Sequence, residues 1–302
     1  IENQIRDDIL DKTQIICCTC IGSGNEILDG RRFSQVLIDE ATQATEPASL
    51  VPLIRGARQI VLVGDHKQLP PTVLSFRAEE KGLKRSLFER LVDLGIEPFL
   101  LTKQYRMHPS ISKFPNKQFY SSKLIDGVNA SSRPAPAGLL WPDWDNPVAF
   151  IPIEGGELVS PDGTSRENPA EVSWVLKITE DLLEAGELTK KDIGIITPYA
   201  GQVRAIRNSM DEKLDDVEVR TVDGYQGREK EVIIFSCVRS NPEGNVGFLA
   251  EPRILNVALT RAKRGLIVIG DPATLRSDKN WQAWLEYIRN SKFEAWHLLG
   301  MA

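Results

Sequence analysis

The sequence predicts an α/β protein built on parallel sheets. Short, almost wholly apolar runs rich in Val and Ile recur along the chain, and helix-like or polar segments separate them. Strands that are buried on both faces have this composition. Nearly every run ends in polar or charged residues, at the strand ends where parallel sheets bind their ligands. The runs are TQIICCTCI, QVLIDE, QIVLVGD, IGIITPY, EVIIFSCV and GLIVIGD.

The composition is that of a soluble globular protein. The chain has 302 residues, of which 41% are hydrophobic and 26% charged, enough for two domains with their own cores. No run approaches the roughly 18 apolar residues of a membrane helix, and IENQIRDDIL does not read as a signal peptide. We expect an intracellular protein, cytoplasmic or nuclear. With a net charge of -5, it would bind a polyanion through a local groove.

Residues 1–98 form the first predicted unit. Three apolar runs come before about residue 70, and SLFERLVDLG has helical spacing with a glycine stop. The run TQIICCTCI holds Cys17, Cys18 and Cys20. No second Cys or His pair is in range for a metal site, and free cysteines are usually buried. The pattern therefore favours a core strand over a metal site.

Residues 99–302 form the second predicted unit. The segment 121–170 is dense in Pro, Gly, Ser and Asn, which predicts mostly loop with one strand near VAFIPI. The next segment is helical, with Asn168 as the N-cap and Pro169 at the first helical position. Strands are expected to resume at 193, 232 and 266.

Two adjacent acids end the second apolar run. Asp39 and Glu40 repel each other unless a cation pairs with them, and nucleotide hydrolases place a carboxylate on Mg²⁺ in this way. An ordinary surface Asp-Glu pair is the alternative. The next run ends in GDHKQLPP, where the amide of Gln68 could hydrogen-bond both a terminal phosphate and a water.

Two arginines are candidates for phosphate contacts. Arg106 lies in LTKQYRMHP and Arg261 in NVALTRAKRG. A guanidinium stays protonated and offers a planar fork of donors, which suits the charge of a transferring phosphoryl group. A surface salt bridge is the alternative role for each.

Five motifs together carry a family resemblance. DEATQ, GDHKQLPP, QYRM, TVDGYQGREKE and NVALTRAK, in this order between roughly residues 13 and 275, resemble the motifs of superfamily 1 helicases of the Upf-like, 5′-to-3′ group. The resemblance implies two RecA-like domains in tandem. It also implies an ATP-dependent helicase that uses ATP and Mg²⁺ and moves along single-stranded nucleic acid, with RNA favoured over DNA.

The resemblance implies roles for individual residues in catalysis. Asp39 would hold Mg²⁺, Glu40 would polarise the attacking water, and Gln68 would contact the γ-phosphate and that water. Arg106 and Arg261 would stabilise the γ-phosphate charge, with Arg261 as the arginine finger.

Further positions match the family's nucleotide and nucleic-acid contacts. Tyr105 would pack against adenine, Glu229 would bind the ribose, and Gly227 would allow a tight turn. The positions that match the nucleic-acid track are Thr19, Pro198, Tyr199 and Thr221. For Tyr199 a packed aromatic ring is the alternative, and for Thr221 it is strand capping.

One expected motif is absent from these residues. The phosphate-binding loop GxxxxGK(S/T) requires a Gly-Lys pair, and the 302 residues contain none. We therefore expect an incomplete first domain with exposed apolar surface and an open sheet edge. The missing portion would come from the same gene or from another chain, and these residues alone would be inactive. The alternative is a non-catalytic module that binds nucleic acid or a protein.

Overall fold

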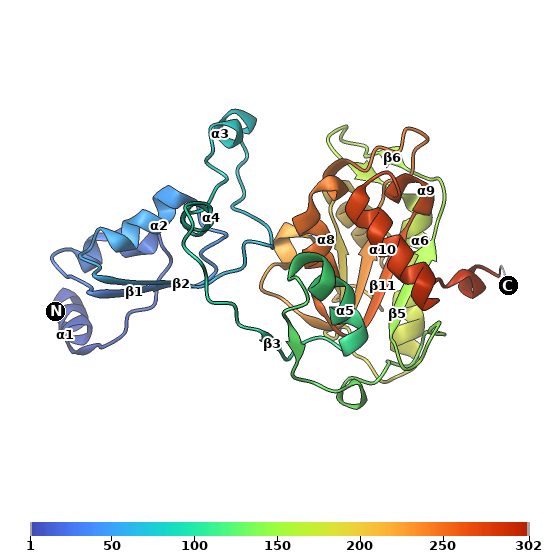
Figure 1. Ribbon diagram of the computed structural model, residues 1–302, viewed down its shortest axis with the longest axis horizontal. Coiled ribbons are helices and arrows are strands. Elements are labelled where there is room, and N and C mark those ends of the chain that lie inside the picture. The colour runs from blue at the N-terminus through green and yellow to red at the C-terminus, as the bar shows by residue number, and fades with distance from the viewer. Residues whose placement is uncertain (1, 301–302) are drawn as a thin grey trace. The chain divides into compact units, whose positions relative to one another are not determined.

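The computed structural model describes residues 2–300, which divide into two compact units. The first comprises the residues up to 66 together with 70–98, and the second comprises 67–69 together with the residues from 99 onward. Figure 1 colours the first unit blue to blue-green and most of the second green to red.

The first unit is built around two parallel strands. β1 (Gln35–Ile38) pairs with β2 (Gln59–Leu62), so that Val36 lies opposite Ile60. Leu37 and Val61 are exposed, as expected for a sheet with apolar strands and few neighbours. The helices of this unit are α1 (Glu2–Lys12), α2 (Glu46–Leu53), α3 (Phe76–Glu80) and α4 (Leu87–Asp93).

The expected helix within SLFERLVDLG is confirmed as α4. The Ser86 hydroxyl accepts a hydrogen bond from the backbone N–H of Glu89, which caps the first turn. Gly95, just past the helix, has a φ of 89°, a conformation that favours glycine.

The expected core strand in TQIICCTCI is wrong. Residues 15–19 form no regular element, and the side chains of Cys17 and Cys18 are exposed. A β-favouring composition forms a strand only when another strand pairs with it. Within residues 2–98 the only paired strands are β1 and β2, and they pair with each other.

The second unit contains a five-stranded parallel sheet, which confirms the predicted α/β class. The strand order is β5–β11–β10–β8–β9. Four strands match strands predicted from the sequence: β5 (Val148–Pro152), β8 (Ile193–Thr197), β10 (Lys230–Ser236) and β11 (Ala262–Gly270). The sequence did not predict the fifth, β9 (Glu218–Thr221). It is an edge strand, and of its residues only Val219 is apolar and buried.

Two hydrophobic clusters cover the two faces of this sheet. On one face, Ile233 and Phe235 pack with residues from α5 (Pro109–Phe119), α8 (Pro252–Leu259) and α10 (Lys279–Ser291). On the other face, Val232 and Ile234 pack with residues from α6 (Pro169–Glu184) and α7 (Ala200–Ser209). Figure 1 shows α8, α5 and α10 on the viewer's side of the strands.

Asn168 caps α6 as predicted, because its side-chain oxygen accepts hydrogen bonds from the N–H groups of Ala170 and Glu171.

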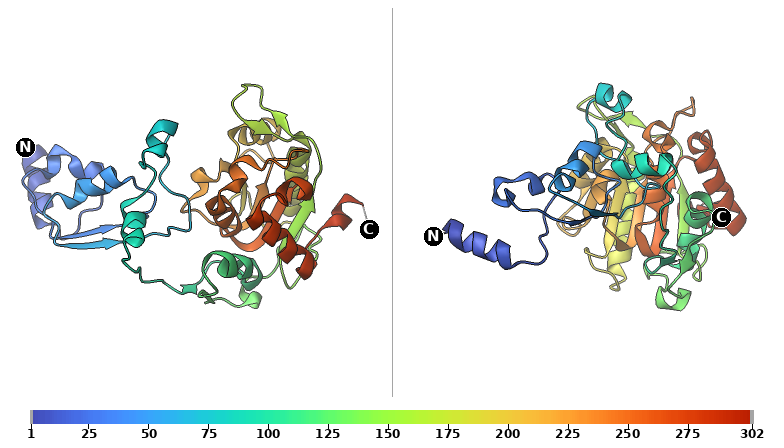
Figure 2. Two further views of the ribbon diagram at one scale, coloured as in Figure 1. Left: turned by 45° about the horizontal axis from the view of Figure 1, so that its top comes forward. Right: turned by 60° about the vertical axis from the view of Figure 1, so that its left-hand side comes forward.

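The segment 121–170 is mostly loop, as expected. Besides β5, it holds the short strands β4 (Ile125–Asp126), β6 (Leu158–Val159) and β7 (Arg166–Glu167). The left view of Figure 2 shows the yellow-green hairpin of β6 and β7 projecting from this unit. Two further short elements are β3 (Lys103–Gln104), which pairs with β4, and α9 (Pro272–Leu275).

Candidate functional site

Asp39 and Glu40 lie in a strained turn directly after β1. Both side chains are exposed. Glu40 has a φ of 50°, a left-handed conformation that is uncommon outside glycine. An Asp39 carboxylate oxygen accepts the Glu40 N–H at 2.9 Å, and Gln43 Nε2 donates to Glu40 Oε2 at 2.8 Å. Strained residues of this kind cluster at functional sites. The turn presents two carboxylates at the carboxyl end of a parallel strand.

The turn after β2 packs closely against this acidic turn. The Ala41 N–H donates to the Val63 carbonyl at 2.8 Å. A Cβ on Gly64 would lie 3.0 Å from a methyl carbon of Thr42. Thr42 itself is buried, and its hydroxyl has no hydrogen-bond partner among the described residues. A buried hydroxyl without a partner costs free energy, so it marks this turn for a functional explanation.

In the second unit the structure brings Gln68 and Arg261 together. Arg261, between α8 and β11, is 2% exposed. Its Nη2 donates to Gln68 Oε1 at 2.8 Å and to the Thr260 hydroxyl at 3.1 Å, and its Nε donates to the Val257 carbonyl at 3.3 Å. The amide side chain of Asn256 further holds this segment by donating to the Lys67 carbonyl at 2.8 Å.

Arg106 and Glu229 form an ion pair in the same unit. Arg106 Nε lies 2.6 Å from Glu229 Oε2, and Lys263 Nζ lies 3.1 Å from Glu229 Oε1. Burial acts to raise the pKa of Glu229, but the hydrogen bonds from Arg106 and Lys263 outweigh it, so this pKa lies below its ordinary value. Arg106 also donates to the Thr260 carbonyl at 3.0 Å. Both arginines therefore contact Thr260.

Gly227 lies two residues before Glu229 in a turn. Its φ is 71°, and an added Cβ would meet nothing within 4 Å. The glycine is thus required for backbone conformation rather than for space.

Tyr105 presents an exposed aromatic ring beside Arg106. The ring is 61% exposed, and Lys103 Nζ lies 5.5 Å from its centroid. A Cβ on Gly127 would lie 2.6 Å from the ring, so this glycine lets the ring rest against the backbone. The exposed face can accept a stacked planar group.

Pro198, Tyr199 and Thr221 lie together at the carboxyl ends of β8 and β9, where Thr197 is paired with Thr221. Tyr199 is 4% exposed, so its ring has almost no surface to offer a base. This matches the packed-aromatic alternative. Thr19, in the first unit, is exposed, and its hydroxyl accepts the Gly22 N–H at 2.9 Å.

Sequence reasoning missed two side chains here. Lys263 shares the carboxylate of Glu229, and its place in the ALTRAKRG run beside Arg261 was the available signal. The ring of Phe248 packs against that of Tyr199, with centroids 5.4 Å apart and a 39° angle between the ring planes. Nothing in the sequence pattern pairs it with Tyr199.

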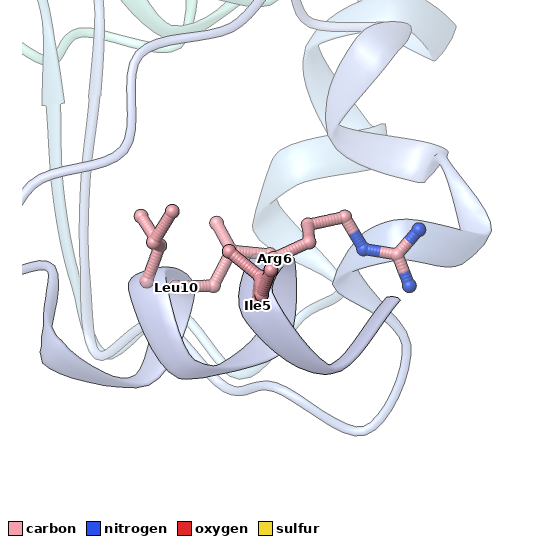
Figure 3. A pocket seen from close by; sticks show the side chains of 4 residues that line it. Ile5, Arg6 and Leu10 are labelled. Carbon is pink, nitrogen blue, oxygen red and sulfur yellow. The ribbon is translucent and has the colours of Figure 1, made fainter. Parts of the chain in front are cut away.

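Other features of the described residues add no site. A hollow along α1 is lined by Ile5, Arg6, Ile9 and Leu10, all from one helix, and Figure 3 shows no cluster of polar groups there. Between residues 2 and 300, no group of three or more His, Cys, Asp or Glu side chains is placed to hold a metal ion. No helix in that range combines the length and apolar character needed to cross a membrane.

Comparison with known proteins identifies the family. Two family models, each described as an AAA domain, match residues 1–76 and 83–273. The chain is 45% identical over 298 residues to the regulator of nonsense transcripts 1 homolog of Drosophila melanogaster, covering 96% of this chain and 25% of that protein. It is 45% identical over 290 residues to the ATP-dependent helicase NAM7 of Saccharomyces cerevisiae, covering 93% of this chain and 30% of that protein.

The chain therefore spans only about a quarter to a third of the relatives it matches. A solved structure, that of PRRSV helicase, is 16% identical with a TM-score of 0.42 over 80% of this chain and 36% of that chain, too distant to add to the assignment. The two domain matches and the identity across almost the whole chain agree with the ordered motifs. The chain belongs to the AAA-domain helicases of superfamily 1, in the group of regulator of nonsense transcripts 1.

Proposed function

We propose that this chain is part of an ATP-dependent motor that couples ATP hydrolysis to 5′-to-3′ movement along single-stranded nucleic acid in the cytoplasm or nucleus. The observation that carries the proposal is the convergence of Gln68, Arg261, Arg106 and Glu229 around Thr260 in a chain of this family. A buried arginine held by an amide side chain is a preorganised positive charge, which suits a transferring phosphoryl group.

The residues present fit a nucleotide in part. Tyr105 offers an exposed ring for a purine, and Glu229 offers carboxylate oxygens for ribose hydroxyls. Arg106 and Arg261 would face the γ-phosphate, and the side-chain amide of Gln68 would contact it. The backbone turn at Gly227 would shape this edge.

The first unit would supply the magnesium site. Carboxylate oxygens are the ligands that Mg²⁺ prefers, and Asp39 presents one at the end of β1. Glu40 would orient the attacking water. Bound Mg²⁺ would neutralise phosphate charge. The buried, unpartnered hydroxyl of Thr42 in the same turn supports a polar ligand at this position.

We further propose that residues 1–98 and 99–302 are parts of two RecA-like motor domains, the first of them incomplete. The 302 residues contain no GxxxxGK(S/T) loop, so a phosphate-binding loop would have to be supplied by the same gene product or by another chain.

Single-stranded nucleic acid is the proposed partner, with RNA favoured over DNA. Thr19, Pro198 and Thr221 would contact the strand through hydroxyl and backbone groups, as in proteins that hold a single strand without reading its sequence. The net charge of -5 requires such a local track rather than a basic surface.

The alternative function is a non-catalytic module that binds nucleic acid or a protein. The deciding experiment measures ATP hydrolysis by the full-length protein with and without single-stranded RNA, using a DNA strand of the same sequence for comparison. The motor proposal predicts hydrolysis that the strand stimulates. Strand binding without any ATP turnover would favour the module instead.

A further inference from the structure

A strained loop follows β10. Val238 is wholly buried, β-branched, and has a φ of 71°. Such a conformation is strained and persists only where the surrounding structure fixes it. Here both carboxylate oxygens of Glu171 accept the Val238 N–H at 2.9 Å, and Asn168 Nδ2 donates to the Val238 carbonyl at 3.1 Å.

The residues after Val238 are held just as firmly. The carboxylate of Glu157 accepts hydrogen bonds from Arg239 Nε at 3.1 Å, from the Ser240 N–H at 2.8 Å and from Asn241 Nδ2 at 2.9 Å. Asn241 and Asn245 then close the loop, because the Asn245 N–H donates to Asn241 Oδ1 at 2.8 Å. Residues 238–248, which we call the β10 loop, therefore have a fixed backbone.

The β10 loop presents Phe248. Its ring is 64% exposed and rests on the buried ring of Tyr199 at 5.4 Å and 39°. The hydroxyl of Tyr199 accepts the Phe248 N–H at 3.3 Å. A Cβ on Gly247 would lie 2.5 Å from the Tyr199 hydroxyl and 2.1 Å from Arg239 Nη1, so only glycine allows this approach. Tyr199 and Gly247 together fix the position of Phe248.

The surroundings of Phe248 suit a planar ligand. Between residues 160 and 295, Phe248 is the only large apolar side chain that is mostly exposed, while Leu158 and Val159, which follow Glu157, are 51% and 55% exposed. A protein partner usually covers a contiguous apolar patch, whereas a nucleobase needs one aromatic face. Tyr199, which supports the ring, directly follows Pro198 and lies two residues past the end of β8, whose last residue Thr197 pairs with Thr221. Phe248 thus lies near the carboxyl ends of β8 and β9, where the single-stranded nucleic acid is proposed to bind.

We infer that Phe248, supported by Tyr199, is the residue on which an unpaired nucleobase of the bound strand stacks. The inference rests on the proposed function, because it requires the strand to run along this edge. Stacking on one ring is tolerant of sequence, since every base has a π-face.

The test measures binding of the full-length protein to a single-stranded RNA and to the same strand with abasic sites. Phe248→Ala should weaken binding of the natural RNA by roughly tenfold, the scale of one stacked base, and should reduce the preference for natural over abasic RNA. Phe248→Tyr should keep both the affinity for natural RNA and the preference for natural over abasic RNA. Phe76→Ala, which removes an exposed phenylalanine of the first unit, is the matched control and should change neither.

A fluorescent variant gives an independent readout. Natural RNA should quench the fluorescence of the tryptophan introduced by Phe248→Trp, and abasic RNA should quench it much less, because quenching requires a base on the ring. If Phe248→Ala binds natural RNA as tightly as the wild type, the inference is wrong while the proposed function stands. Normal RNA binding with lost strand-stimulated hydrolysis would also contradict the inference, because it would assign Phe248 to the coupling between strand binding and hydrolysis. A wild-type protein that binds no single strand would overturn both.

Discussion

Replacing Glu171 with Gln should remove a pH-dependent contribution to the stability of the second unit. Glu171 is wholly buried in the first turn of α6. Burial raises the pKa of this carboxyl from its ordinary 4.5 to about 8, although hydrogen bonds from the Ser236 hydroxyl and the Val238 N–H favour the charged form. The nearby charge of Asp271 adds to the rise. Burial also raises the pKa of the neighbouring Cys237 thiol.

The direction in which stability changes with pH follows from the number of protons that each state binds. Between pH 4.5 and about 8 the folded state keeps a proton on Glu171 that the unfolded state has released. The stabilisation is therefore fully present below pH 4.5 and is lost as the pH rises to about 8. Each pH unit inside this window costs about 1.4 kcal/mol, so the whole window costs several kcal/mol. A glutamine does not titrate, and its amide can still accept the Val238 N–H.

Urea unfolding at a series of pH values provides the assay. All six tryptophans lie at residue 141 or beyond, so intrinsic fluorescence reports on the second unit alone. The difference in unfolding free energy between Glu171→Gln and the wild type should move in favour of the variant by about 1.4 kcal/mol per pH unit from pH 5 to 8. Glu180→Gln, which changes an exposed carboxylate on the same helix, should track the wild type. Parallel curves for Glu171→Gln and the wild type would refute the reasoning.

Two further predictions concern catalysis. Arg261→Ala in the full-length protein should slow ATP hydrolysis by roughly a thousandfold or more, because it removes an arginine-finger charge, while strand binding is kept; hydrolysis at the wild-type rate would exclude the finger role. The 302 residues alone should show no detectable ATP turnover, because they contain no GxxxxGK(S/T) loop; robust turnover by this chain would show that such a loop is not needed.

The sequence predicted the central strands of the second unit well, because burial on both faces leaves an unbroken apolar run. β8 and β10 are of this kind. β9 was missed because an edge strand is partly solvated, and the residues from Glu218 to Thr221 are polar except for Val219. The run around Cys17 was misread as a strand for the opposite reason. Its composition favours a strand, but among the described residues no strand pairs with it.

The candidate site divides in a similar way. Short ordered motifs predicted candidate residues for catalysis, and the structure pairs Gln68 with Arg261 and Arg106 with Glu229. The sequence did not predict that Tyr199 is buried and that Phe248 is the exposed ring beside it. This arrangement depends on a loop held by Glu157 and Glu171 from distant parts of the chain. Glutamates are common in the first turn of a helix because they interact favourably with the helix dipole, so the sequence does not mark Glu171 as unusual. Only the packing shows that Glu171 is buried.

The most direct test of the motor proposal compares Glu40→Gln with the wild type in the full-length protein. Both ATP binding and single-strand-stimulated ATP hydrolysis should be measured on the same preparations. The account predicts that the variant binds ATP as the wild type does and hydrolyses none at a measurable rate, because the amide does not act as the base that orients the attacking water. Wild-type hydrolysis by Glu40→Gln would contradict it.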